Sequence, residues 1–129
     1  MVVVNARIVD TSSWIQYFKA KPYLDIDEAL QNGQVYLSPI IIAELLSGKL
    51  PPSKKAALVD FLRELPLVSV EFDHWIRVGE LRRKAAEKGL SLSTPDAHIA
   101  QCCIDIGAKL ISEDLIFKKL TKIVPTLLL

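Results

Sequence analysis

The segment from Ser93 to Phe117 limits what this chain can fold into more than any other stretch. Its pattern predicts a helix that ends at Gly107, which suits the left-handed position after a helix, followed by a short apolar strand. Thr94 is the expected N-cap, Asp96 lies in the first helical turn, and Asp114 follows the strand. In an open α/β sheet, ligands bind at the carboxyl ends of the strands. Both carboxylates could therefore meet in one crevice.

The rest of the chain alternates apolar strands with helices that can cover them. A β-branched run, Val2–Val9, predicts the first strand, and either Thr11 or Ser12 is expected to cap the next helix. The last strand contains Pro125, which favours an edge position. Further strands are expected at residues 35–37, 67–71, 109–111 and 122–128, and helices at 14–18, 25–32, 40–47, 53–65, 73–88, 95–106 and 115–120. This order predicts a single α/β domain over residues 1–129, with three layers (α/β/α) and a central, mostly parallel sheet.

The composition indicates a globular protein without a strong overall charge. Hydrophobic residues make up 50% of the chain and charged residues 24%, which excludes a disordered protein. The net charge of +1 gives no global reason to bind nucleic acid, so any such binding needs a local basic patch. Basic side chains gather on two predicted helices. They could form either a solvated helix face or a surface that guides RNA phosphates. They are Arg82, Arg83, Lys88, Lys118 and Lys119.

Several polar and sulfur-containing residues are expected to have structural roles only. Cys102 and Cys103 are adjacent and cannot pair with each other without strain, so we expect them in the core of a protein from a reducing compartment. His74 and His98 lack further ligands at metal-binding spacing, and Asp105 near a helix end is expected in solvent. With neither a signal-peptide pattern nor a membrane-length apolar run, the sequence favours a soluble, cytoplasmic protein.

Four acids can frame the same edge of the sheet. Asp10 follows the first strand, where it is either a helix cap or a ligand-binding acid. Glu44 lies in a helix that is apolar nearly all round, and helices of this kind are expected to be buried. Burying the Glu44 carboxylate is costly unless it is paired, exposed on a narrow face or bound to metal. With Asp96 and Asp114 they form an oxygen-only set that suits Mg²⁺ or Mn²⁺. Such an ion can activate water for phosphodiester hydrolysis.

Three segments together resemble the PIN domain, specifically ribonucleases of the VapC toxin type. The segments are IVDTSSWIQYF, SPIIIAELLSGK and LRRKAAEKGLSLSTPDAHIAQCCIDIGAKLISEDLIFKKL, in the family's order over almost the whole chain. The resemblance implies a metal-dependent endoribonuclease that hydrolyses RNA, the toxin of a type II toxin–antitoxin pair. It also implies that Asp10, Glu44, Asp96 and Asp114 are the catalytic and metal-binding residues, with Mg²⁺ or Mn²⁺ as the ion.

The resemblance further implies supporting residues and partners. Thr11 or Ser12, together with Ser112, would hold the acidic set by hydrogen bonds. The protein would form a homodimer and be neutralised by a small antitoxin that covers the site. The apolar helices at residues 14–18 and 61–65 are plausible docking surfaces for it.

One departure from the family's pattern concerns the last acid. Leu115 stands where the family often has a polar or basic residue, and Glu113 lies next to Asp114, so whether Glu113 assists at the site stays open. Asp114 is preferred because it keeps the family's spacing to Ser112 and Phe117.

Two other functions are compatible with the same fold. One is a PIN-domain nuclease of RNA maturation, and the other is a non-catalytic module that binds RNA or a protein partner. The complete acidic set argues against the non-catalytic module, because a degenerate domain is expected to have lost at least one acid.

Overall fold

A computed structural model describes residues 5–19 and 22–129, and its centre is a parallel sheet of three strands. The strand β1 (Arg7–Val9) lies between β2 (Val35–Tyr36) and β3 (Lys109–Ile111). Arg7 pairs with both Val35 and Lys109, so the three strands run in step. Their carboxyl ends therefore meet at one edge of the sheet, as the sequence predicts.

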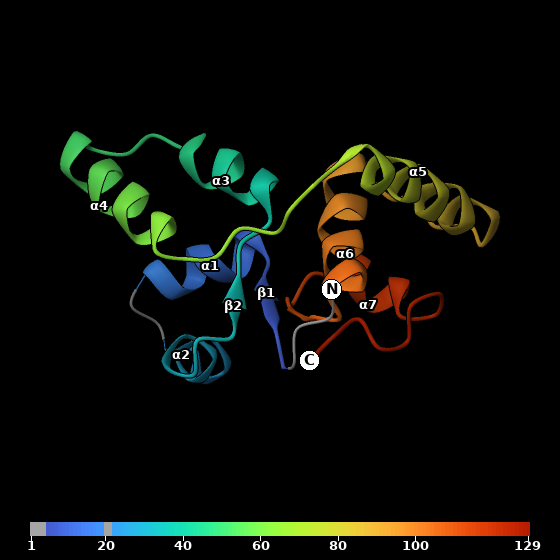
Figure 1. The fold of residues 1–129 in the computed structure, drawn as a ribbon, viewed down its shortest axis with the longest axis horizontal. Helices are drawn as coiled ribbons and strands as arrows, with labels where there is room; N and C mark the ends of the chain where they lie inside the picture. Colours follow the sequence, from blue (N-terminus) through green and yellow to red (C-terminus); the bar gives the residue numbers. More distant parts are fainter. Residues whose placement is uncertain (1–4, 20–21) are drawn as a thin grey trace.

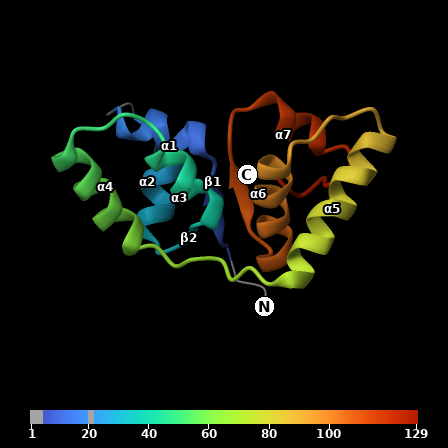
Figure 2. The same ribbon diagram turned by 90° about the horizontal axis from the view of Figure 1, so that it is seen from above.

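Two groups of helices flank the sheet (Figures 1 and 2). Helices α1 to α4 lie on the side of β2, and α5 to α7 on the side of β3. The long helix α5 packs against α6, and α6 in turn contacts β1, β3 and α3. The helices are α1 (Thr11–Phe18), α2 (Leu24–Gln31), α3 (Pro39–Leu46), α4 (Pro52–Arg63), α5 (Phe72–Glu87), α6 (Thr94–Ile106) and α7 (Leu115–Leu120). The predicted α/β architecture around a parallel sheet is confirmed.

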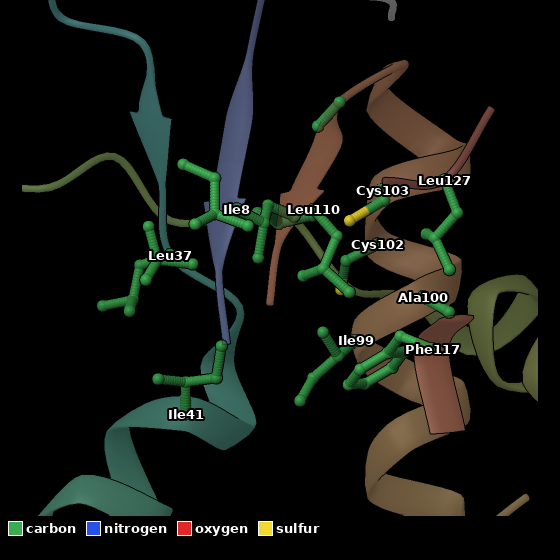
Figure 3. Packing of buried hydrophobic residues seen from close by; sticks show 14 of the residues in the cluster. Ile8, Leu37, Ile41, Ile99, Ala100, Cys102, Cys103, Leu110, Phe117 and Leu127 are labelled. Carbon is green, nitrogen blue, oxygen red and sulfur yellow. The ribbon is translucent and has the colours of Figure 1, made fainter. Parts of the chain in front are cut away.

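The hydrophobic core joins both groups of helices to the sheet (Figure 3). Ile8 and Leu110 project from β1 and β3, with Ile41 of α3 on one side and Ile99 of α6 and Phe117 of α7 on the other. All five side chains are at most 1% exposed. The core extends over the whole sheet, and Cys102 and Cys103 lie within it as free thiols.

Two of the predicted strands are wrong. Residues 67–71 form a single parallel bridge, between Leu67 and Leu37, and Leu67 is 54% exposed. Residues 122–128 are mostly turns, and only Leu128 bridges to Leu110 of β3. Pro125 has no N–H to donate, so this segment cannot continue a hydrogen-bonded ladder. Both segments have strand-like composition but lack a partner strand along their length.

The beginning of the first predicted strand is also different. Residues 2–4 lie outside the described residues, and Asn5 is a turn residue with φ of 56°. The strand therefore starts at Arg7. Helices α2 to α7 begin and end within two residues of the predicted positions, whereas α1 begins three residues earlier because Asp10, and not Thr11 or Ser12, is its N-cap.

The N-cap of α6 is Ser93 instead of the predicted Thr94. The Ser93 hydroxyl accepts a hydrogen bond from the N–H of Asp96 at 3.2 Å, which leaves Thr94 as the first helical residue. Gly107 ends α6 with φ of 70°, the left-handed conformation predicted for it. Within the described parts of the chain, none of the helices has the length and apolar character needed to cross a membrane.

Candidate metal centre

Asp10 lies where β1 ends and α1 begins, and it is both the N-cap of α1 and a candidate metal-binding carboxylate. One of its oxygens, Oδ1, accepts the N–H of Thr11 at 2.8 Å. The other, Oδ2, accepts the hydroxyls of Ser12 at 3.1 Å and Ser112 at 2.9 Å. The side chain is only 4% exposed, so three donors replace the water that this carboxylate loses on burial. Both Thr11 and Ser12, which the sequence left as alternatives, contact Asp10.

Asp114 joins Asp10 from the end of β3. The Ser112 hydroxyl that donates to Asp10 also accepts the N–H of Asp114 at 3.1 Å. Burial, and then the neighbouring carboxyl and charge of Asp114, raise the pKa of Asp10 to about 6, although the bonds from Ser112 and Thr11 act in the opposite direction. Two carboxylates this close cannot both be ionised without cost. A divalent cation removes that cost, so these two acids fit a metal-binding role.

Glu44 is connected to the cluster through Thr11. The hydroxyl of Thr11 donates to Oε1 of Glu44 at 2.7 Å, while its N–H bonds to Asp10. The expectation that α3 is buried nearly all round is wrong, because only Ile41 and Leu45 are buried and Glu44 is exposed. The Glu44 carboxylate therefore needs no metal to be tolerated, and its position is set by Thr11.

Of the four acids, Asp96 is the one that no hydrogen bond among the described residues links to the others, either directly or through Thr11 or Ser112. It is half-buried in the first turn of α6. In residues 5–19 and 22–129, its carboxylate takes part in no hydrogen bond or ion pair. Within those same residues, the four acids also do not form a group tight enough to hold a single ion as they stand. The structure thus brings Asp10, Glu44 and Asp114 together and leaves Asp96 dependent on the position of α6.

Glu113 and Asp114 face different neighbours. Asp114 acts on Asp10, as its effect on the Asp10 pKa indicates. The pKa of the Tyr23 hydroxyl is raised by burial and by nearby charges, of which Glu113 is the largest, whereas a bond with Ser13 acts in the opposite direction. Glu113 therefore lies toward Tyr23, beside the cluster.

A buried chain of hydrogen bonds, which sequence reasoning missed, lies next to this edge. We call it the histidine chain; its members are Ser38, His98, His74 and Asp105. Ser38 Oγ lies 2.9 Å from Nε2 of His98, whose Nδ1 lies 2.7 Å from Nε2 of His74. Nδ1 of His74 lies 2.7 Å from the carboxylate of Asp105. The members are far apart in sequence, so no local pattern could have revealed the chain.

The expectation that Asp105 is solvated is also wrong. Arg77 donates two hydrogen bonds of 3.0 Å to its carboxylate, and Gln101 donates one of 2.8 Å. Burial alone would raise the pKa of Asp105, but the bonds from Arg77, His74 and Gln101 outweigh burial and hold the pKa below its usual value. Asp105 is thus a fixed anion at the end of the histidine chain.

The two candidate RNA-binding arginines of α5 already have intramolecular partners. Nε of Arg82 donates to the carbonyl of Leu92 at 2.8 Å, and Arg83 forms an ion pair with Glu87 at 2.6 Å. Both side chains remain exposed. The Arg83–Glu87 pair is typical of a solvated helix face, and the Arg82 bond holds the loop before α6 against α5.

The lysines are placed differently. Lys88 at the end of α5 and Lys119 of α7 line one surface hollow, together with Lys122. Lys118 is exposed on the same short helix as Lys119. Three ammonium groups around one hollow make a local positive patch in a chain whose net charge is only +1.

An apolar groove lies between α1 and α4. Ile15 and Phe18 of α1 are 44% and 42% exposed, and the neighbouring Leu50 is 38% exposed. They line the groove together with Tyr17, Leu45, Leu58 and Phe61. Trp14, which lies in the predicted docking helix at residues 14–18, is fully buried and belongs to the core instead.

Comparison with known proteins identifies the family. The model of the PIN domain matches residues 7–123. Ribonuclease VapC2 of Haemophilus influenzae is 27% identical over 113 residues, which cover 84% of this chain and 86% of the relative. A second Haemophilus influenzae protein, Ribonuclease VapC, matches to the same extent.

Solved structures agree on the fold. The DNA-bound VapBC structure from Salmonella typhimurium contains a chain with a TM-score of 0.79 and 24% identity, covering 97% of this chain and 96% of that one. A chain of VapBC2 from Rickettsia felis, bound to a promoter DNA fragment, gives a TM-score of 0.76 at 22% identity, covering 95% and 96%. With a family model that spans nearly the whole sequence, this chain belongs to the PIN-domain family.

Proposed function

We propose that this protein is a Mg²⁺- or Mn²⁺-dependent endoribonuclease and the toxin of a type II toxin–antitoxin pair. The single observation that carries the proposal is the pairing of Asp10 with Asp114 at the carboxyl edge of the sheet. A buried carboxylate with a pKa of about 6 beside a second carboxylate is a poor arrangement for stability and a good one for a divalent cation. The relatives named Ribonuclease VapC support an RNA substrate.

Each acid of the cluster has a distinct role in this proposal. Asp10 and Asp114 would bind the cation, and Glu44 and Asp96 would complete the set and accept a proton from the attacking water. When bound, the ion supplies a water of lowered pKa and stabilises charge at phosphorus. Ser12, Ser112 and the Thr11 N–H keep the Asp10 oxygens oriented, and the Thr11 hydroxyl orients Glu44.

The RNA backbone would be guided by the lysine hollow. Lys88, Lys119 and Lys122 line it, and Lys118 is exposed nearby. Arg82 and Arg83 would contribute less, since both already have partners within the chain. Phosphate binding by these groups predicts an affinity that falls with salt concentration.

The partners follow from the exposed apolar surfaces. The solved relatives are VapBC assemblies, so we expect a small antitoxin, with the groove between α1 and α4 as its docking site. A second copy of the chain would cover the apolar face of α5, where Phe72 is 80% and Ile76 is 48% exposed. Burial of these side chains would stabilise a homodimer.

Cleavage of total cellular RNA by purified protein tests the proposal. Reactions with Mg²⁺, Mn²⁺ or EDTA are compared for the wild type, Asp114→Asn and the matched control Glu113→Gln. We expect discrete fragments that require metal, persist in Glu113→Gln and are lost in Asp114→Asn. Cleavage that continues in EDTA, or in Asp114→Asn after contaminating nucleases are excluded, would refute this function. Intact RNA under all conditions, also after refolding free of antitoxin, would favour a binding module.

A further inference from the structure

We propose that the histidine chain positions the acid-bearing helices α3 and α6, with Ser38 and His98 as positioning residues for the metal centre. This inference rests on the proposed function, because it concerns the same four acids. Glu44 is on α3 and Asp96 on α6, and among the described residues the Asp96 carboxylate has no hydrogen bond or ion pair of its own. Whatever fixes α6 against α3 therefore fixes the distance between these two carboxylates.

Ser38 is the structural reason for this assignment. It lies just after β2, at the carboxyl edge of the sheet, and it is the N-cap residue of α3. Its hydroxyl makes no capping bond to α3 and contacts Nε2 of His98 instead. An N-cap serine normally bonds to its own helix. Here the capping bond is absent, and the fully buried Ser38 hydroxyl instead links α3 to α6 through its hydrogen bond with His98.

The chain has one self-consistent order of protons when both imidazoles are neutral. Ser38 donates to Nε2 of His98, Nδ1–H of His98 donates to Nε2 of His74, and Nδ1–H of His74 donates to Asp105. Burial lowers the pKa of His98 to about 4, which agrees with a neutral ring. All four imidazole nitrogens are then satisfied, and each ring is held by a bond at both ends.

Neighbouring side chains bury the two histidines and hold the carboxylate end of the chain. Arg77 and Gln101 hold Asp105, which ends the chain between α5 and α6. Trp75 stacks on the His98 ring at a centroid distance of 4.8 Å and an interplanar angle of 12°. His74 and His98 are 2% and 1% exposed. The hydrogen bonds therefore link α3 to α6 and α6 to α5 through buried histidine side chains.

A metal site at His74, His98 and Cys102 fits the geometry less well. Their potential ligand atoms lie within 4.8 Å of one another. However, the Cys102 sulfur is 3.9 Å from Nδ1 and 3.7 Å from Nε2 of His98, so it lies beside the ring. An ion bound to Nδ1 lies in the ring plane and away from Nε2, where this sulfur cannot reach it. The 2.7 Å separation of the two histidine nitrogens is that of a hydrogen bond.

Three substitutions in the histidine chain and one matched control separate positioning from general stability. Ser38→Ala removes the α3–α6 tie and leaves the backbone capping of α3 unchanged. His98→Asn keeps a polar atom near the Nδ1 position and loses the bond to Ser38, whereas His98→Gln can retain that bond. Val78→Ala is the matched control, because Val78 is 2% exposed on the face of α5 that packs against α6 and has no part in the chain.

Mn²⁺ affinity, followed by electron paramagnetic resonance of the free ion, is the principal readout. We expect Ser38→Ala and His98→Asn to bind Mn²⁺ about tenfold more weakly, with kcat lowered and KM for RNA unchanged. His98→Gln should bind as the wild type does, and Val78→Ala should lose stability without losing affinity. Wild-type affinity in Ser38→Ala, or an equal loss in Val78→Ala, would overturn the proposal.

Amide hydrogen exchange in EDTA separates failure of this inference from failure of the proposed function. If the wild type neither binds Mn²⁺ nor cuts RNA, the function is wrong, but the positioning of α6 can still be measured. We expect faster exchange of the Ala97 N–H, which bonds to the Ser93 carbonyl, in Ser38→Ala than in Val78→Ala. Equal exchange at the start of α6 in the wild type and Ser38→Ala would overturn the positioning role.

Discussion

Replacing Asp10 by asparagine should stabilise the metal-free protein while it abolishes RNA cleavage. Asn keeps the shape of the side chain and can still accept the Thr11 N–H, and the hydroxyls of Ser12 and Ser112 can turn to accept from its amide. What disappears is the buried charge next to Asp114. The ionised Asp10 carboxylate is therefore expected to lower the stability of the metal-free protein, although RNA cleavage requires it.

The magnitude follows from the Asp10 pKa, which is raised from 3.8 to about 6. At about 1.4 kcal/mol per pKa unit, this corresponds to about 3 kcal/mol at full ionisation. The folded protein binds the proton more tightly than the unfolded chain does. Its free energy of unfolding therefore falls as the pH rises from about 4 to about 6, and the loss persists at higher pH.

Urea denaturation in EDTA at pH 4 and pH 8 measures this effect. The difference in the free energy of unfolding between Asp10→Asn and the wild type should grow by about 2 kcal/mol in favour of the variant from pH 4 to pH 8. This is less than the full effect because the Asp10 carboxyl of the unfolded chain is already more than half ionised at pH 4. Any effect of the substitution on hydrogen bonding that is the same at pH 4 and pH 8 cancels when the two differences are compared. A difference that is the same at both pH values would refute the reasoning, because Asp10 would then ionise normally in the folded protein.

The remaining predictions concern the support of the site, the core and the groove. Ser112→Ala removes a donor to Asp10, and initial rates of RNA cleavage should fall about tenfold. Phe117→Ala empties a fully buried position, and urea denaturation should show a loss of about 3–5 kcal/mol. Ile15→Asp places a charge in the groove between α1 and α4, so calorimetry should show weakened antitoxin binding, while cleavage by the free protein stays at the wild-type rate.

Local signals explain the parts of the fold that the sequence predicts well. Gly107 stops α6 because its φ of 70° suits glycine. The positions of Asp10 and Asp114 at the edge of the sheet are predicted because Asp10 directly follows β1 and Asp114 comes shortly after β3. The prediction of strands at 67–71 and 122–128 was wrong because an apolar run has the composition of a strand whether or not a partner strand lies beside it. Tertiary contacts decide whether two strands pair, and the hydrophobic periodicity of the sequence carries no information about those contacts.

Charged and polar contacts were the harder part of the site to predict. The apolar sequence of α3 left three possibilities for Glu44, which could be paired, exposed on a narrow face or bound to metal. In the structure Glu44 is exposed. The histidine chain was invisible because Ser38 and His98 are 60 residues apart, and His74 and His98 are 24 apart. The sequence spacing of His74 and His98 gives no metal-ligand motif, yet the fold brings both side chains within 4.8 Å of the Cys102 sulfur. Their actual arrangement needs the fold.

The central claim is that a divalent cation binds at the carboxyl edge of the sheet, and anomalous diffraction from crystals soaked in Mn²⁺ tests it most directly. The account predicts an anomalous peak between the carboxylates of Asp10 and Asp114, absent in Asp114→Asn crystals treated in the same way. A peak at His74, His98 and Cys102, or no peak near Asp10 in crystals of protein that cleaves RNA, would contradict it.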